Sequence, residues 1–214
     1  VLKEKKYCIF GIGGFGREVL TCLIDKIADT KLKIEDVAVF MVDDSYYHCS
    51  EIMGIPVIKR SDFDPEKYQV VVAVGDPLER MIIISQLPEE TSYTSIIHPS
   101  AVISNWVEIG EGSIITAGVI LTCNIKIGKH CHLNLHTTIG HDCQIGDYFT
   151  SAPGTNISGK CTFGDCVYFG SNTSVREGIS ICDNTTIGMG GVVVKNIQTS
   201  GVYIGNPVSQ LKGT

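Results

Sequence analysis

The chain has 214 residues, of which 43% are hydrophobic and 19% charged, and its formal net charge is −6. An acidic chain with no basic run is a poor partner for nucleic acid, and no stretch approaches the roughly 18 apolar residues needed for membrane insertion. Its nine cysteines include no CxxC pair, so we expect reduced core thiols and a cytoplasmic protein.

Residues 1–95 read as alternating strands and helices. Apolar runs at 7–10, 37–42 and 69–74 predict three strands. Aliphatic residues at helical spacing predict helices over 17–28 and 77–87. Strands joined through helices form half of a doubly wound sheet, so we expect an α/β, half-Rossmann domain.

The glycine-rich turn Gly11-Ile12-Gly13-Gly14-Phe15-Gly16 follows the first predicted strand. Backbone N–H groups in such a turn can approach a phosphate, although glycines there can equally serve tight packing. Asp43-Asp44 ends the second strand and Gly75-Asp76 the third, so all three segments would meet at the crevice where such sheets bind ligands. We expect a mononucleotide diphosphate attached to another group, because half a sheet leaves little room for a dinucleotide.

From Ile97 to Gln198 the chain repeats every six residues. Sixteen of seventeen opening positions are Ile, Leu, Val or Phe, with Ser151 the exception, and seven second positions are Gly. This period predicts a coil of short parallel strands, three hexads to a turn, over residues 96–198. We expect the opening aliphatics to stack along its axis, with the inward fifth-column residues, among them Cys131, Cys143 and Cys161, beside them. We expect the second-column glycines to supply the backbone angles of the corners, and residues 1–95 and 199–214 to cap the two ends.

His141 is the candidate catalytic residue of the coil. It occupies the outward third column, is followed by Asp142, and is not needed for packing. A neighbouring carboxylate can fix the tautomer of an imidazole and raise its basicity, as general-base chemistry requires. A solvated surface histidine is the alternative interpretation. Four of the six histidines lie in two consecutive coils: His130, His132, His136 and His141.

A zinc site is the competing hypothesis for these histidines. The spacing of His136 and His141 is similar to that of the paired zinc ligands in γ-class carbonic anhydrases. The third ligand of that family would fall on Ser100, and His98 is two residues out of register. Two ligands do not make a catalytic zinc site, so we expect no metal.

Five segments of the chain together resemble one known family. They are Gly13-Gly14-Phe15-Gly16, Val42-Asp43-Asp44, Ala73-Val74-Gly75-Asp76, Ile139-Gly140-His141-Asp142 and Gly205-Asn206-Pro207. The family is the hexapeptide-repeat acyltransferases that hold bacterial nucleotide-activated amino-sugar N-acetyltransferases and sialic acid O-acetyltransferases. The resemblance implies a left-handed parallel β-helix and a homotrimer. It also implies acetyl-CoA in the groove between neighbouring β-helices and a sugar nucleotide on the N-terminal domain.

The resemblance also implies roles for single residues. His141 would be the general base, Asp142 its acidic partner, and Asn134 a polar group near the reacting centre of the sugar. Thr150 stands where many relatives carry a second histidine near the thioester, and its hydroxyl could donate a hydrogen bond there. The implied oxyanion and acetyl-CoA positions are Gly159, Thr150, Gly170 and Gly188, and the implied sugar-nucleotide positions are Gly11, Gly13, Gly14, Phe15, Gly16, Asp43, Asp44, Gly75 and Asp76.

The implied reaction is acetyl-CoA-dependent N-acetylation of a UDP- or dTDP-linked 4-amino-4,6-dideoxy sugar, for bacterial surface-glycan or glycoprotein synthesis. We expect direct attack in a ternary complex, because no residue resembles an activated nucleophile. One alternative is O-acetylation of sialic acid or a related sugar, and another is a nucleotide-binding trimeric scaffold without activity. A nucleotide pocket argues against the first, and the pairing of His141 with Asp142 argues against the second.

Overall fold

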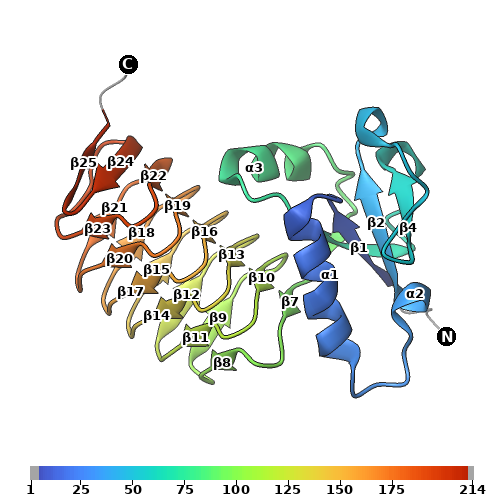
Figure 1. Ribbon diagram of the computed structural model, residues 1–214, viewed down its shortest axis with the longest axis horizontal. Coiled ribbons are helices and arrows are strands. Elements are labelled where there is room, and N and C mark those ends of the chain that lie inside the picture. Colours follow the sequence, from blue (N-terminus) through green and yellow to red (C-terminus); the bar gives the residue numbers. More distant parts are fainter. Residues whose placement is uncertain (1–4, 212–214) are drawn as a thin grey trace.

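A sheet domain covered by helices is followed by a left-handed parallel β-helix in the computed structural model (Figure 1). The structure describes residues 5–211. The outermost residues of the predicted end segments, 1–4 and 212–214, lie outside the described residues. The architecture confirms the predicted fold class. Within residues 5–211, no helix has both the length and the apolar character to cross a membrane.

The sheet of the N-terminal domain has the strand order β3-β4-β2-β1-β5-β6. β1 (Lys6–Phe10) pairs in parallel with β2 (Ala38–Val42) on one side and β5 (Tyr68–Val72) on the other. These are the three strands that the apolar runs predict. The remaining elements are α1 (Gly14–Ile27), α2 (Ile34–Val37), η1 (Asp44–Tyr46), β3 (Glu51–Ile52), β4 (Ile55–Lys59), η2 (Arg60–Asp62), α3 (Pro77–Ser85) and β6 (Ser92–Tyr93).

Helices α1 and α3 cover opposite faces of this sheet. Side chains alternate along β1, so that Ile9 packs with α1 while Cys8 and Phe10 pack toward α3. Both faces are therefore apolar, which explains why the strands read as continuous apolar runs. α3 begins where the Asp76 carboxylate accepts a hydrogen bond from the Glu79 N–H at 2.9 Å.

Three parallel ladders form the β-helix, and each strand pairs with one eighteen residues further on, as Ile114 does with His132. The first ladder comprises β7 (Ile96–Ile97), β10 (Ile114–Ile115), β13 (His132–Leu133), β16 (Thr150–Ser151), β19 (Tyr168–Phe169) and β22 (Thr185–Ile187). The second comprises β8 (Val102–Ile103), β11 (Ile120–Leu121), β14 (Thr138–Ile139), β17 (Asn156–Ile157), β20 (Ser174–Val175) and β23 (Val192–Val193). The third comprises β9 (Val107–Ile109), β12 (Ile125–Ile127), β15 (Gln144–Ile145), β18 (Thr162–Phe163) and β21 (Ser180–Ile181).

The column of opening aliphatic residues forms the buried core of the β-helix, as predicted. Cys131, Cys143 and Cys161 are fully buried beside it as small apolar side chains. Ser151, which interrupts the column, is also buried, and its hydroxyl shares a 2.9 Å hydrogen bond with that of Thr137. A polar residue is tolerated in the core there because its hydroxyl finds a partner.

The corners turn at the fourth column, and the expectation that the second-column glycines provide their backbone angles is wrong. Every fourth-column residue from Gly112 to Gly190 has a positive φ, for example 58° at His136. Second-column glycines are needed for a different reason. A Cβ on Gly110 would lie 2.5 Å from the backbone of Gly128 in the next coil, so close stacking of the coils excludes a side chain.

Both ends of the β-helix are in contact with other elements. Ile96 and Ile114 of the first coil share a core cluster with α1, which Figure 1 shows between the sheet and the β-helix. At the other end, β24 (Gly201–Gly205) extends the first ladder and forms an antiparallel hairpin with β25 (Val208–Gln210). The domain limits at 95/96 and 198/199 stay predictions.

Candidate active site

His141 and Asp142 lie at the corner between the second and third ladders, which we call the dyad corner. His141 Nδ1 and Asp142 Oδ2 are 2.8 Å apart, and both side chains are about half exposed, at 48% and 46%. Asp142 is the fourth-column residue of its coil, with a φ of 60°. The tight turn thus places neighbouring side chains in contact within an otherwise regular coil.

The carboxylate of Asp142 decides which nitrogen of His141 is free. A charged carboxylate accepts the proton of Nδ1–H, which leaves the lone pair of the neutral ring on Nε2. Hydrogen bonds from His141 and from Asn124 hold the pKa of Asp142 below its ordinary range. Asp142 is therefore an anion whenever the imidazole is neutral, and its charge keeps the proton of the neutral ring on Nδ1.

Gly159, one coil further on, lies directly under the imidazole. A Cβ at this position would be 2.7 Å from both Cε1 and Nε2 of His141, so only glycine leaves room for the ring. Within residues 5–211, the Gly159 N–H donates no hydrogen bond. A basic nitrogen and an available N–H donor therefore lie side by side at the dyad corner.

Asn134, Gly170 and Gly188 lie elsewhere, at the corner between the first and second ladders, which we call the first corner. Asn134 is at the opposite end of β14 from His141, and its amide donates to the carbonyl of Ser151 at 2.8 Å. Gly170 stacks on the backbone around Gly188. A single chain does not bring these predicted residues to the dyad.

The implied role of Thr150 at the thioester is wrong. Thr150 lies on β16 and is 2% exposed, and its hydroxyl donates to the carbonyl of Gly75 at 3.0 Å. The same oxygen accepts a hydrogen bond from Arg80 at 3.0 Å. Its single proton is thus used within the protein, because β16 faces the N-terminal domain, whereas His141 lies at another corner.

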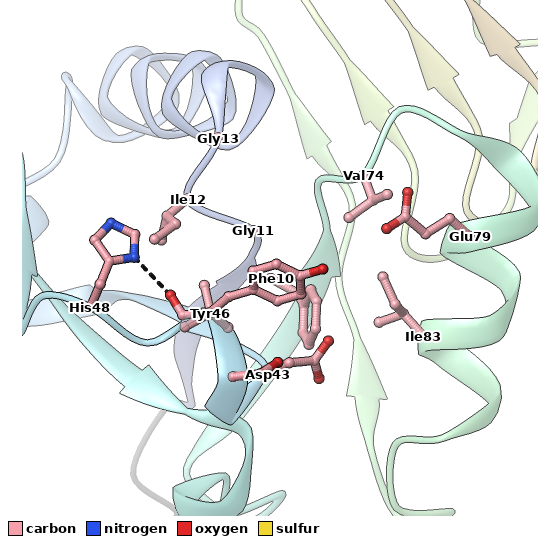
Figure 2. Close-up of a pocket in the computed structure, with 12 residues that line it drawn as sticks. Phe10, Gly11, Ile12, Gly13, Asp43, Tyr46, His48, Val74, Glu79 and Ile83 are labelled. Carbon is pink, nitrogen blue, oxygen red and sulfur yellow. Dashed lines mark hydrogen bonds between the residues drawn. The ribbon is translucent and has the colours of Figure 1, made fainter.

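A pocket of about 560 Å³ opens at the carboxyl ends of β1, β2 and β5 (Figure 2). Figure 2 shows Glu79 and Ile83 of α3 facing Asp43 and Tyr46 across it. We call it the nucleotide pocket, after the ligand predicted for this edge of the sheet. It is lined by Phe10, Gly11, Ile12, Gly13, Val42, Asp43, Ser45, Tyr46, His48, Val74, Glu79 and Ile83.

The glycines of the turn divide into structural and open positions. Gly11 has a φ of 108°, which other residues rarely adopt. Gly16 is buried, and a Cβ there would clash with the carbonyl oxygen of Gly11. Around Gly13 and Gly14, in contrast, a Cβ would meet no protein atom within 4 Å. The N-terminus of α1 thus leaves free backbone N–H groups and open space for an anion.

Phe15, the remaining predicted residue of the turn, lies outside the lining of the pocket. Its ring packs against that of His132 in the β-helix, with the centroids 5.0 Å apart. It thereby ties the glycine turn to the neighbouring domain.

Only one of the acidic side chains predicted at this edge lines the pocket. Asp43 does, and one of its oxygens accepts a hydrogen bond from Arg60 at 2.9 Å. Asp44 instead holds the backbone N–H and the hydroxyl of Ser61, and these hydrogen bonds lower its pKa. Asp76 caps α3 and lies with Gly75 outside the lining. The sequence places all of them at strand ends but does not say which way each side chain points.

Several lining residues were not predicted from the sequence, notably Tyr46, His48 and Glu79. Glu79 had a detectable signal, because it stands three residues after Asp76 in the pattern of a helix start. Tyr46 ends η1 and His48 lies two residues further on, with its Nδ1 2.8 Å from the Tyr46 carbonyl oxygen, as Figure 2 shows. Neither residue belongs to a motif, so the sequence carried no signal for them.

A buried arginine, also missed, joins the two domains. Arg80 on α3 is 0% exposed and donates to carbonyl groups on both sides, at 2.7 Å to Val74 and 2.6 Å to Tyr148. It also lies 3.0 Å from His132 Nδ1, while His132 Nε2 lies 3.0 Å from the Val72 carbonyl oxygen. Burial lowers the pKa of Arg80 to about 10, so the guanidinium is charged at neutral pH.

The histidines of the zinc hypothesis do not converge. His98 lies 2.8 Å from Asp25 of the N-terminal domain, whereas the His136 ring is over Gly118. Among residues 5–211, no group of three or more His, Cys, Asp or Glu side chains is placed to hold a metal ion.

Two family models match the chain. The PglD N-terminal domain matches residues 6–87, and the hexapeptide repeat of succinyl-transferase matches residues 101–123 and 162–195. GDP-perosamine N-acetyltransferase from Escherichia coli O157:H7 is 32% identical over 177 residues, which are 81% of this chain and 79% of that protein.

Solved structures resemble the chain along almost its whole length. The acetyltransferase domain of PglB from Neisseria gonorrhoeae FA1090, in complex with acetyl coenzyme A, has a TM-score of 0.86 at 26% identity. The match covers 98% of this chain and 100% of that one. PerB from Caulobacter crescentus, in complex with CoA and GDP-perosamine, has a TM-score of 0.85 at 26% identity, with both chains covered completely.

Proposed function

Because the chain belongs to the hexapeptide-repeat N-acetyltransferases of nucleotide-linked amino sugars, we propose that it transfers the acetyl group of acetyl-CoA to the amino group of such a sugar. One observation carries the proposal: His141 Nδ1 is 2.8 Å from Asp142, and its ring lies over the free N–H of Gly159. The names of the relatives favour N-acetylation over the O-acetylation that the sequence left open.

The reaction needs a base, an electrophile and a place for negative charge. The neutral amine of the sugar attacks the thioester carbonyl carbon, and its N–H proton passes to Nε2 of His141. The electron pair of the C=O bond moves onto oxygen, where the N–H of Gly159 stabilises the charge. Collapse of this intermediate breaks the C–S bond, and the leaving sulfur takes the proton back from His141. Asp142 stabilises the imidazolium in between.

A homotrimer would complete this site. His141 is at the dyad corner, whereas Asn134, Gly170 and Gly188 are at the first corner. Packing the first corner of one copy against the dyad corner of the next would bring the two sets together. Large side chains exposed at these corners support such packing, with Met189 81% and Trp106 71% exposed. Light scattering that returned an active monomer would contradict this assembly.

The nucleotide pocket is the proposed site of the nucleoside diphosphate. Gly13 lines the pocket and caps α1, whose dipole favours a diphosphate, and Asp43 faces the space for the base or ribose. The family resemblance predicts UDP or dTDP, whereas two of the relatives above are described with GDP-perosamine. We propose a 4-amino-4,6-dideoxy sugar destined for a surface glycan as the acceptor.

The test is acetyl transfer to a defined panel of acceptors. The purified protein is incubated with acetyl-CoA and 4-amino-4,6-dideoxy sugars linked to UDP, dTDP or GDP, and products are identified by mass. Each amino sugar is paired with its 4-hydroxy analogue. We expect acetylation of an amino sugar and not of its analogue, because an amine is the better nucleophile. Transfer to the hydroxyl analogues, or to no member of the panel, would contradict the proposed function.

A further inference from the structure

Asn124 lies on the side of Asp142 that faces away from His141. Its Nδ2 donates a hydrogen bond to Asp142 Oδ1 at 3.2 Å, while Asp142 Oδ2 is 2.8 Å from His141 Nδ1. Each oxygen of the carboxylate therefore has its own partner. The three side chains form one continuous hydrogen-bonded row, Asn124–Asp142–His141.

The stacking of the coils produces this row. Asn124 and Asp142 are fourth-column residues of successive coils, with φ values of 53° and 60°. The Asp142 N–H donates to the carbonyl of Cys123 at 3.1 Å, which fixes one corner above the other. Side chains that leave equivalent corners in register necessarily face each other.

Solvent and other charges compete for the Asp142 carboxylate. A pocket of about 440 Å³ opens beside it, and Glu108 and Lys126 line that pocket with their charged groups 3.7 Å apart. On the other side lie Lys160 and Glu177, whose charged groups are 2.9 Å apart. The positive charge of Lys160 attracts the Asp142 carboxylate and helps to lower its pKa. A carboxylate that is 46% exposed between these groups can turn away from His141 unless something holds it.

We propose that Asn124 is a positioning residue for the acetyl transfer, a role that rests on the proposed function of His141. Its amide holds Asp142 Oδ1, so that Oδ2 stays on the Nδ1 side of the imidazole. The ring then keeps the tautomer and the orientation that place the Nε2 lone pair over Gly159. Asn124 itself touches neither substrate in this scheme.

The competing explanation is purely structural. Asn tolerates a positive φ better than most residues, and Asn172 and Asn184 occupy the same column with φ of 58° and 55°. Asn184 is at a different corner, between the third and first ladders, and no contact joins it to His141 or Asp142 among the described hydrogen bonds. It is therefore the matched control.

The first experiment compares Asn124→Gly with Asn184→Gly, because glycine keeps the left-handed backbone and removes only the side chain. We expect Asn124→Gly to lower kcat by about 3- to 10-fold, the range set by one hydrogen bond of ordinary strength. The KM values for both substrates should not change, since neither binds Asn124. Asn184→Gly should keep the wild-type kcat.

The second experiment replaces Asn124 by Asp and follows kcat against pH. A second carboxylate beside Asp142 repels it when both are charged, and the repulsion raises the pKa of the pair. At lower pH a shared proton again gives Asp142 Oδ1 a donor. The kcat of Asn124→Asp relative to wild type should therefore be lowest at high pH and recover as the pH falls.

Three outcomes overturn the inference: wild-type kcat in Asn124→Gly, equal losses in the two glycine variants, or a pH-independent ratio in Asn124→Asp. Loss of trimer or of far-UV circular dichroism identifies a folding defect, and the pH ratio of Asn124→Asp then decides. Full activity in His141→Ala would instead refute the proposed function. The two failures are thus distinguishable.

Discussion

The dyad corner and the nucleotide pocket are built in opposite ways. The dyad corner takes His141, Asp142 and Gly159 from successive coils whose hydrogen bonds fix every position. The nucleotide pocket gathers Asp43, Tyr46 and Glu79 from a strand end, η1 and α3. Under the proposed function, the chemistry therefore lies on the repetitive part of the molecule, whereas recognition depends on segments that can vary without disturbing a core.

The largest expected effect concerns catalysis at the dyad corner. Replacing His141 by Ala should lower kcat by about 10²- to 10⁴-fold, the usual contribution of a positioned base. The fold should persist, because the half-exposed side chain contributes little to the core. The measurement is turnover of the purified protein with both substrates saturating. Asn184→Gly, at the corner between the third and first ladders and away from the proposed site, is the control and should retain full activity.

A smaller loss is expected when the space under the imidazole is filled. The Cβ of Gly159→Ala would lie 2.7 Å from His141 Nε2, so the ring must move. A displacement of about 1 Å at a reacting group costs up to about 100-fold in rate, so we expect a 10- to 100-fold lower kcat. Steady-state kinetics on Gly159→Ala and on the neighbouring exposed Ser158→Ala check this. Equal rates in both would show that the position of the ring is unimportant.

The contact between the N-terminal domain and the β-helix should weaken in acid. Burial lowers the pKa of His130 from 6.5 to about 4, and its ring lies between Tyr93 and Tyr148 at the domain interface. The unfolded chain therefore binds a proton below pH 6.5 that the folded chain does not, and the free energy of unfolding falls as the pH drops toward 4. One such group accounts for about 2 kcal/mol between pH 7 and pH 5.

Urea unfolding at pH 7 and pH 5 measures this effect. His130→Asn removes the titrating group and keeps a residue suited to the left-handed backbone. Its free energy of unfolding should therefore fall less between pH 7 and pH 5 than that of wild type. Asn184→Gly lies in the same column and removes no titrating group, so it should keep the wild-type pH dependence. An unchanged pH dependence in His130→Asn would contradict the assignment.

The smallest effect concerns recognition in the nucleotide pocket. Asp43→Asn should raise the KM for the sugar nucleotide by about 3- to 10-fold and leave that for acetyl-CoA unchanged. Asn keeps an acceptor for Arg60, so the pocket wall should hold. Asp44→Asn should leave both KM values near wild type, because Asp44 is held by Ser61 outside the lining. A larger rise in the KM for sugar nucleotide in Asp44→Asn than in Asp43→Asn would show that Asp43 is not the residue that contacts the ligand.

The sequence was most informative where one physical rule acts repeatedly. The hexad predicts the ladders and the buried Cys131, Cys143 and Cys161, because stacking coils admit only apolar or small residues inside. The same periodicity places His141 outside the core. It did not show why second-column glycines are needed, because their constraint comes from the backbone of the next coil and not from their own φ.

The sequence by itself determined the fold class and the pairing of His141 with Asp142, because both follow from short-range periodicity and adjacency. Only the tertiary structure decided that Asp43 and not Asp44 lines the pocket, and that Thr150 lies at the domain interface. It also brought Arg80 to Tyr148, 68 residues away along the chain. The physical reason is that these choices depend on which elements pack together, and no local pattern of residues records the orientation of a side chain at such a junction.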